Sequence, residues 1–334
     1  MRIIDPELQI INQGYDLDSI YKHIELCGRT CYHSQDKITE DSAKRFVDNL
    51  IKSGHGSVLE HGTVYLTIPG EYEPDEWGRA EVFVDYKGSY RYNKYSKVVV
   101  EYWEQEPVGT QCDFCKKISR SRVHITTNLR VLVENDWLDD LKYLCEPTEH
   151  HEKRVTVKFI TGIDISREIN RHRVNSISEE STRYCNYSLG KFGNSINVAL
   201  NTDIDEQDVI DCAETWTSCW DDNCLNEDRL FRTMCSKIGN NKDDLFGIVD
   251  TWLFANSACE WAYKRLISLG WKAQQARRVL PLDTQTELVH TAFVSDWKHF
   301  LSLRSPKYGA TGVHPDAAYL GDMLYEQLKT MICG

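Results

Sequence analysis

The order in which helix and strand patterns follow one another constrains the fold of this chain most. Apolar residues recur at helical spacing within residues 39–54, where a threonine and a glycine provide a start and a stop. Short runs rich in β-branched and aromatic residues predict strands at 63–69, 98–103 and 154–160. Because strands and helices do not alternate regularly, the pattern predicts an α+β fold rather than a doubly wound α/β fold.

Further patterns predict where the remaining helices lie. Helical spacing covers residues 126–141, 164–173, 205–225, 244–270, 274–280 and 315–332, whereas residues 283–304 mix strand and helix patterns. Asp164 or Ser166 is expected to cap the helix over 164–173. The acidic stretch that includes 205–225 is expected to form a helical insertion at the surface.

Overall charge and apolar content limit the classes of function. The chain has 334 residues, 41% of them hydrophobic, and a net charge of -12. We expect a sizeable core and neither nucleic-acid nor membrane binding. Without a membrane-length apolar run or a signal-peptide core, a cytoplasmic location with reduced thiols is expected. Among twelve scattered cysteines, the single CxxC pair of Cys112 and Cys115 indicates a metal or redox site only weakly.

One strongly polar segment, INRHRVNSISEESTRYCNYS, runs from Ile169 to Ser188 and contains three arginines, a histidine and two glutamates. Arg167 and Arg171 lie four residues apart and are expected on one helix face. Either they pair with carboxylates such as Glu168 and Glu179, or their forked donors hold an anion. Spacing alone leaves both alternatives open.

Other polar residues favour an anion site. Arg277 and Arg304 lie at the ends of apolar segments of an acidic chain, although Arg278 is more typical of a solvated side chain. His172 lies between two arginines, which predicts a neutral, hydrogen-bonding imidazole. Ser181 lacks a G-x-S-x-G elbow, so we expect its hydroxyl to bind a ligand rather than to act as a nucleophile.

A second polar segment, GHGSVLEHG (Gly54 to Gly62), contains His55, Glu60 and His61. Their spacing does not fit the helical H-E-x-x-H zinc motif, so a turn that contacts a cofactor is favoured and no metal ligands are predicted. The chain has neither G-x-G-x-x-G nor a Walker A sequence. Any dinucleotide is therefore expected to bind through arginines and turns.

The most specific motif is RHR, then seven residues, then serine, at residues 171–181. Five further blocks accompany it: GRTCYHSQDKI, SGHGSVLEHG, AYKRLISLG, QQARRVLP and FLSLR. Taken in their order along the chain, the six blocks resemble those of the flavin-dependent thymidylate synthases, the ThyX family. The resemblance extends from Cys27 to Arg304. The resemblance implies one ThyX-like catalytic domain over residues 1–334, an antiparallel sheet packed with helices, and insertions at about 70–150 and 200–245.

The resemblance also implies an activity and the residues that perform it. Members methylate dUMP to dTMP with methylenetetrahydrofolate, FAD and NADPH, in homotetramers whose active sites lie at subunit junctions. Arg304 would be catalytic by favouring the ionised uracil ring, without a cysteine nucleophile. The implied dUMP contacts are Glu168, Arg171, Glu179, Ser181, Thr182, Arg183 and Arg277. The implied FAD contacts are Ser57, Arg171, His172, Arg173 and His299.

Several positions depart from the family pattern. Glu168 stands where the family has glutamine, and Phe293 and Ser295 stand where many members have asparagine and arginine. The segment after Arg304 is also longer than usual. These departures leave two alternatives open: a related flavin-dependent enzyme that modifies a pyrimidine nucleotide, or a non-catalytic protein that binds nucleotides or RNA.

Overall fold

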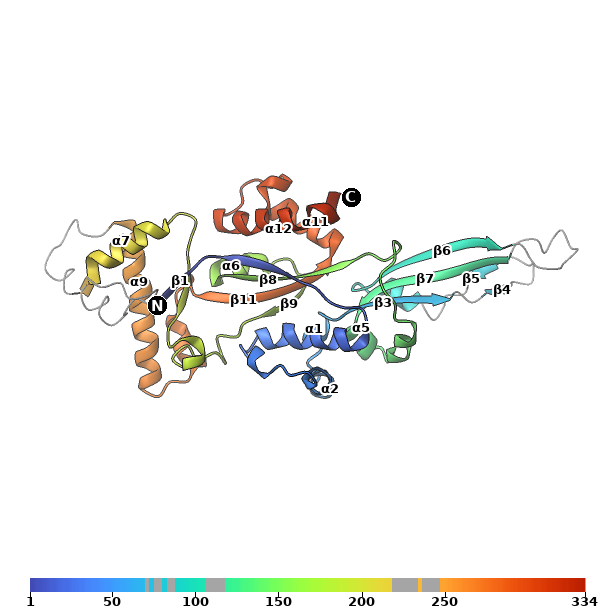
Figure 1. Ribbon diagram of the computed structural model, residues 1–334, viewed down its shortest axis with the longest axis horizontal. Coiled ribbons are helices and arrows are strands. Elements are labelled where there is room, and N and C mark those ends of the chain that lie inside the picture. Colours follow the sequence, from blue (N-terminus) through green and yellow to red (C-terminus); the bar gives the residue numbers. More distant parts are fainter. Residues whose placement is uncertain are drawn as a thin grey trace, which may run out of the picture.

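The computed structural model describes residues 1–69, 72–74, 80–82, 88–105, 118–217, 234–235 and 247–333. It is elongated (Figure 1), with a central sheet between two layers of helices, a second sheet at one end and the long helix α9 at the other. Helices and antiparallel sheets are not arranged as repeated βαβ units, so the predicted α+β class is confirmed. None of the helices in these residues is long and apolar enough to cross a membrane.

The central sheet contains four antiparallel strands in the order β2-β8-β11-β9. Their bounds are Glu7–Ile11, Arg154–Gly162, Gln285–Phe293 and Ser176–Glu179, respectively. Strand β8 confirms the strand predicted at 154–160. Strand β9 was not predicted, because it lies inside the polar segment and only pairing with β11 reveals it. The sheet thereby joins the N-terminal, middle and C-terminal parts of the chain.

Two layers of helices cover the central sheet. One layer contains α6 (Ile163–Ile169), α11 (Val294–Arg304) and α12 (Pro315–Cys333), and the other contains α1 (Leu17–Thr30), α2 (Ser42–Ser53) and α3 (Gly56–Leu59). Figure 1 shows α11 and α12 on one side of the sheet and α1 on the other. On the first side, alternate residues of β8 pack with buried side chains of α11 and α12: Val155, Val157, Phe159, Trp297, Phe300, Leu320 and Leu324.

The side of the sheet that faces α1 is partly polar. Thr156 Oγ1 lies 2.7 Å from Thr291 Oγ1 and 3.0 Å from His23 Nε2. Thr291 Oγ1 lies 2.8 Å from His61 Nδ1, and His61 Nε2 lies 2.9 Å from Ser178 Oγ. All five side chains are buried. Their chain of hydrogen bonds offsets the loss of water and fixes how α1 and α3 lie on the sheet.

The second sheet has the order β3-β7-β6. Its antiparallel strands are Thr63–Pro69, Ile118–Asn128 and Lys97–Gln105, which confirms the strands predicted at 63–69 and 98–103. A short hairpin of β4 (Tyr72–Pro74) and β5 (Ala80–Val82) and the helix α4 (Gly88–Tyr92) lie between β3 and β6 in the chain. Cys112 and Cys115 lie outside the described residues.

The helix predicted over 126–141 is only partly correct. Residues up to Asn128 belong to β7, because they pair with β3. The helix α5 (Leu129–Glu134) begins where the Asn128 side chain accepts a hydrogen bond from the Val131 amide, and a 3-10 helix (Leu138–Tyr143) follows. Asp136, with φ of 58°, interrupts the helical path between them.

The helix predicted over 164–173 is too long. The observed α6 ends at Ile169, has Gly162 at its N-cap, and uses neither Asp164 nor Ser166 as a cap. Asn170 ends the helix and donates to Glu179 of β9 at 2.8 Å. Arg171 therefore lies beyond the helix, and the prediction that Arg167 and Arg171 share one helix face is wrong.

The end of the molecule opposite the second sheet is built around α9 (Ile248–Ser268), which confirms the helix predicted at 244–270. Helix α7 (Glu206–Thr217) packs on it and confirms the first half of the helix predicted at 205–225, whose remainder lies outside the described residues. Strands β1 (Arg2–Ile4) and β10 (Asn197–Ala199) form a parallel pair nearby. The helix predicted at 274–280 is broken into α10 (Ala273–Ala276) and the 3-10 helix η4 (Arg277–Val279).

Residues 283–304 divide into β11 and α11, and α12 confirms the helix predicted at 315–332. Three more 3-10 turns complete the described elements: η1 (Gln35–Lys37), η3 (Gly190–Phe192) and η5 (Pro306–Tyr308).

Candidate active site

A cleft of about 520 Å³ opens between α6, the end of β9 and η4. Its polar lining consists of three arginines, two carboxylates and four hydroxyls: Arg167, Arg277, Arg278, Glu179, Glu180, Ser166, Ser181, Thr182 and Thr286. Arg277 Nη1 donates to Thr182 Oγ1 at 3.2 Å. In a chain with a net charge of -12, three guanidinium groups beside hydroxyls suit a phosphate or another oxyanion.

Glu179 is held in the cleft wall by a series of hydrogen bonds. Asn170 Nδ2 donates to its carboxylate at 2.8 Å, and Thr286 Oγ1 donates at 3.3 Å. Asn170 Oδ1 in turn lies 3.1 Å from His290 Nε2, while Asn175 Nδ2 lies 3.2 Å from His290 Nδ1. Burial lowers the pKa of His290 to about 3, so its neutral ring donates to Asn170 and accepts from Asn175. The Glu179 carboxylate is thereby oriented before any ligand binds.

Glu180 points away from Glu179 and binds two other side chains. His33 Nε2 lies 2.7 Å from Glu180 Oε2, and the Tyr187 hydroxyl donates to Glu180 Oε1 at 2.9 Å. Burial disfavours the charged form of His33, but the hydrogen bond and charge of Glu180 outweigh that effect and raise the pKa of His33. Glu180 also lines a smaller cavity of about 180 Å³.

Sequence reasoning missed this trio of His33, Glu180 and Tyr187. His33 lies in the GRTCYHSQDKI block and Tyr187 lies near the end of the polar segment, so both were inside stretches that the sequence analysis had singled out. Only the fold shows that they share one carboxylate.

A second group of predicted residues lies between α6 and α11. Arg304 Nη1 donates to Glu168 Oε2 at 2.6 Å, and Arg304 Nη2 donates to the Glu168 carbonyl at 3.0 Å. Arg304 Nε lies 3.5 Å from His172 Nε2, and the His172 ring is 6.2 Å from that of His299. Burial, followed by the charge of Arg304, lowers the pKa of His172 to about 4, so the predicted neutral imidazole is supported.

The position of Arg304 depends on a glycine in α12. A Cβ atom at Gly321 would overlap the Arg304 carbonyl group, so α12 approaches the end of α11 this closely only because residue 321 has no side chain. The Arg304 side chain leaves this fixed point and reaches Glu168, which neutralises part of its charge.

The remaining predicted residues face solvent and are not joined to either group. Arg171, Arg173, Arg183 and Ser57 are exposed. Arg183 lies over the Tyr184 ring, 5.4 Å from its centroid. Arg173 lines a separate cavity of about 250 Å³ beside Phe293. In the single chain the predicted site residues therefore form a cleft group, a Glu168–Arg304 group and an exposed group.

In the predicted cofactor turn at Gly54–Gly62, some polar side chains are buried in hydrogen bonds and others are exposed. Both ring nitrogens of His61 are used by Thr291 and Ser178, and Glu60 accepts a hydrogen bond from Arg130. His55 is exposed. The turn thus fixes α3 to the sheet and leaves only its outer residues for a ligand.

Comparison with known proteins identifies the family. The family model described as thymidylate synthase complementing protein matches residues 17–120 and 144–330. Because the match covers most of the chain, the protein belongs to this family, Thy1, in agreement with the resemblance found in its sequence. No curated protein sequence matches the chain.

Two solved structures show weaker similarity. The UMP/dUMP methylase PolB from Streptomyces cacaoi, bound with 5-Br dUMP, is 16% identical with a TM-score of 0.35, over 99% of this chain and 91% of that chain. Thymidylate Synthase X from Helicobacter pylori, with FAD and dUMP, is 15% identical with a TM-score of 0.31, over 52% of this chain and 66% of that chain. Scores of this size do not establish a shared arrangement, so the assignment rests on the family model.

Proposed function

We propose that this protein is a flavin-dependent thymidylate synthase that methylates dUMP to dTMP, with methylenetetrahydrofolate as the carbon donor and NADPH as the source of reducing equivalents. Family membership supports this activity. The observation that carries the proposal is the arginine-lined cleft, where Ser181, Thr182 and Arg277 are grouped as a phosphate site requires.

The proposed substrate contacts divide between two regions. Ser181, Thr182 and Arg277 bind the phosphate of dUMP, and the oriented carboxylate of Glu179 accepts a hydrogen bond from its sugar or base. Arg171 and Arg183 are exposed, so they complete the site from outside the cleft. A homotetramer with active sites at subunit junctions supplies such residues from another subunit, and we propose that assembly here.

Arg304 is the proposed catalytic residue. A fixed guanidinium stabilises negative charge on the uracil ring, which makes the ring carbon nucleophilic without a cysteine. The neutral His172 beside it adds no competing positive charge. Glu168 offsets part of the positive charge of Arg304. For the substrate to bind, Arg304 has to leave Glu168 or contact Glu168 and the uracil ring together.

The residues proposed for FAD suit a diphosphate and a ring system. Arg171 and Arg173 offer exposed guanidinium donors, and His172 and His299 place two rings near each other. Ser57 offers an exposed hydroxyl at the outer side of α3. When bound, FAD supplies the hydride that completes the methyl group, while these residues hold and orient it.

A second candidate function is favoured by the Glu168–Arg304 pair. A carboxylate that neutralises the proposed catalytic arginine is expected in an enzyme whose base or carbon donor differs from that of a thymidylate synthase. This alternative is a flavin-dependent enzyme that modifies another pyrimidine nucleotide at the same cleft. Mass spectrometry of the product separates the two, because only methylated dUMP fits the first.

The test combines a spectrum with an activity assay. The purified protein is expected to show a flavin spectrum that changes when dUMP is added, and to release tritium from uracil-labelled dUMP when methylenetetrahydrofolate and NADPH are present. A protein that binds no flavin and releases no tritium contradicts the proposal.

A further inference from the structure

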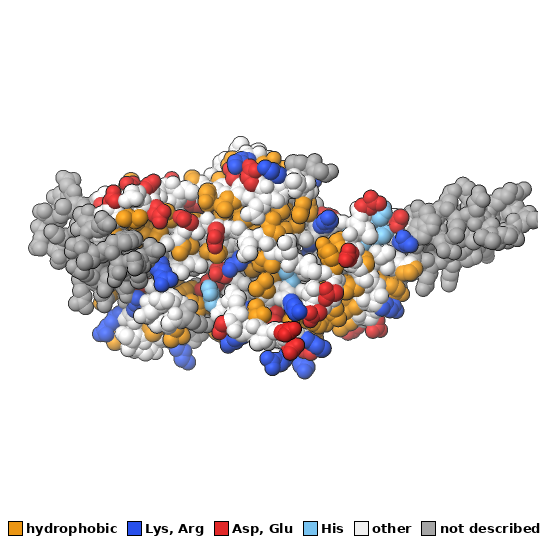
Figure 2. Space-filling view, in the orientation of Figure 1, with side chains coloured by type: hydrophobic (Ala, Val, Ile, Leu, Met, Phe, Trp, Pro, Cys, Tyr) orange, Lys and Arg blue, Asp and Glu red, His pale blue; other side chains and the backbone are white. Residues whose placement is uncertain are grey.

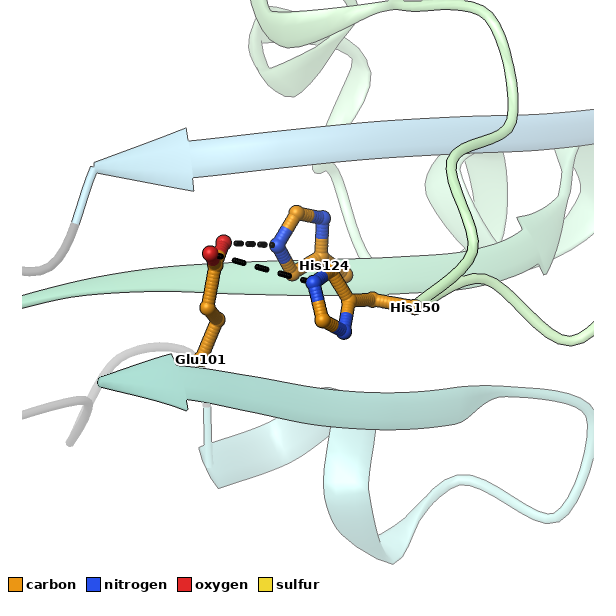
Figure 3. A group of neighbouring side chains, drawn as sticks. All are labelled: Glu101, His124 and His150. Atoms are coloured by element: carbon orange, nitrogen blue, oxygen red, sulfur yellow. Dashed lines mark hydrogen bonds and ion pairs between the residues drawn. The ribbon is translucent and has the colours of Figure 1, made fainter. Parts of the chain in front are cut away.

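Three potential metal ligands from distant parts of the chain converge on the second sheet. Glu101 lies on β6, His124 lies on β7, and His150 lies in the segment that leads to β8. Figure 3 shows both imidazole rings directed at the same carboxylate. Their ligand atoms lie within 4.8 Å of one another, and this is the one group of its kind among the residues that the structure describes.

The sheet register explains why the three meet. Val99 is opposite His124, so Glu101, two residues further along β6, lies diagonal to His124 on the same face of the sheet. Thr67 of β3 is opposite His124 on its other side. His150 reaches the same face because the segment after the 3-10 helix η2 (Leu138–Tyr143) returns along β3, where the Cys145 amide donates to the Tyr65 carbonyl.

The distances suit a small divalent ion. His124 Nε2 is 3.0 Å from Glu101 Oε2, and His150 Nε2 is 3.8 Å from Glu101 Oε1. Ligands of a tetrahedral zinc ion, at bond lengths near 2.0–2.1 Å, lie about 3.3 Å from one another. The observed separations bracket that value. The gap at His150 is too long for a hydrogen bond, so the carboxylate does not satisfy this imidazole directly.

The surroundings of His124 also suit a metal ligand. His124 Nδ1 lies 3.3 Å from Thr67 Oγ1 and 3.5 Å from Thr148 Oγ1. A metal would replace the Nε2 proton that His124 donates to Glu101, and either hydroxyl would then accept a hydrogen bond from Nδ1–H. His151 is close, but its Nε2 is engaged by the Leu66 carbonyl and its Nδ1 accepts from the Thr148 amide, so it is excluded as a ligand.

The group is reached from solvent on one side. The His124 side chain is 3% exposed, whereas those of Glu101 and His150 are each 32% exposed. Figure 2 shows histidine and acidic side chains together on the surface near the second sheet. An ion held there retains room for a water ligand. Glu149 lies near His150 at 3.8 Å, and Arg122 is the residue opposite Glu101 in the sheet register.

We propose that Glu101, His124 and His150 bind one divalent transition-metal ion, with Zn²⁺ as the best match to two imidazoles and one carboxylate. The fourth position is taken by water. None of the three residues lines the arginine-rich cleft, so the ion is not part of the proposed nucleotide site. Instead it fastens the segment around His150 to β6 and β7, and its contribution is to the stability of the second sheet.

The test measures zinc binding by untagged, full-length protein. We expect one Zn²⁺ per chain after equilibration and dialysis, and a melting temperature that rises when Zn²⁺ is added to chelator-treated protein. The variants Glu101→Gln and His150→Ala are expected to bind zinc at least tenfold more weakly and to lose the rise. Glu149→Gln is the matched control: it removes one neighbouring carboxylate outside the trio and is expected to bind like the wild type.

Cobalt substitution separates this site from the cysteines. A Co²⁺ complex of the proposed site has only nitrogen and oxygen ligands, so we expect visible absorption without a thiolate-to-cobalt charge-transfer band. A strong thiolate band, absence of zinc binding by the wild type, or wild-type affinity in both Glu101→Gln and His150→Ala overturns the proposal. Because Glu101 and His150 are partly exposed, both variants are expected to fold, which circular dichroism checks.

Discussion

The pair formed by Glu168 and Arg304 offers the sharpest test of the proposed mechanism. Replacing Arg304 by alanine removes the cation and leaves the Glu168 carboxylate unpaired. Replacing Glu168 by glutamine keeps an oxygen acceptor of the same shape but removes the negative charge. The two substitutions therefore have opposite effects on the local charge and are expected to have opposite effects on turnover.

The magnitudes follow from the geometry. The two side chains are 14% and 28% exposed and meet at 2.6 Å. This is between an exposed pair, worth below about 1 kcal/mol, and a buried pair, whose disruption costs about 3–5 kcal/mol. We expect Arg304→Ala to lower the free energy of unfolding by about 1–3 kcal/mol. Glu168→Gln is expected to cost below about 1 kcal/mol, because Arg304 still donates to the carbonyl of residue 168.

Turnover is measured by tritium release from labelled dUMP, and stability by urea unfolding. Arg304→Ala is expected to abolish turnover in a folded protein. Glu168→Gln is expected to raise it by roughly fivefold, since relief of about 1 kcal/mol corresponds to that factor in rate. The double variant is expected to regain part of the stability lost in Arg304→Ala. Loss of turnover in folded Glu168→Gln refutes the offset-charge interpretation, and wild-type turnover in Arg304→Ala refutes the catalytic role.

Four further predictions concern the cleft, the packing around it and, in two cases, the response to pH. Arg277→Ala is expected to weaken dUMP binding by about 1–3 kcal/mol, measured by calorimetry, because a charge-assisted donor is lost; an unchanged dissociation constant contradicts the phosphate assignment. Gly321→Ala is expected to destabilise the protein and reduce turnover together, since a Cβ displaces the Arg304 backbone; intact turnover refutes that link. The raised pKa of His33 contributes stability that is present below about pH 6.5 and is lost as pH rises through its folded pKa. Glu180→Gln removes the charge that raises this pKa, so the free energy of unfolding, measured with urea at several pH values, is expected to decline less steeply over that range. At the acid side, stability in the same unfolding series is expected to be lost as pH falls from about 6.5 toward 3, because burial lowers the pKa of several histidines in the folded state, among them His23, His172 and His290.

The fold was predictable wherever one pattern continued over many residues. The helices over 248–268 and 315–333 keep their helical spacing throughout, and the strands over 63–69 and 154–162 are long runs of strand-forming residues. The errors occurred where the structure changes within a pattern. Residues 126–128 have helix-compatible neighbours but pair with β3, and this tertiary pairing is not encoded in local spacing.

The candidate site was predictable in its residue types but not in its grouping. Ser181, Thr182 and Arg277 were each singled out, yet only the tertiary fold brings Arg277 of η4 beside Thr182, which is 95 positions away. His33 and Glu180 are 147 positions apart, and no local motif connects them. Long-range contacts of this kind depend on the sheet order, which a single sequence does not specify.

The same limit explains why two carboxylates next to each other have different tasks. Glu179 is the last residue of β9, and Glu180 follows it directly. Their side chains therefore leave the backbone in opposite directions. Glu179 meets Asn170 and faces the cleft, whereas Glu180 meets His33 and Tyr187. A ligand in the cleft therefore encounters one carboxylate oriented by neutral donors and another held by a histidine with a raised pKa. Because Glu180 is already hydrogen-bonded to His33 and Tyr187, the negative charge offered to the substrate comes chiefly from Glu179.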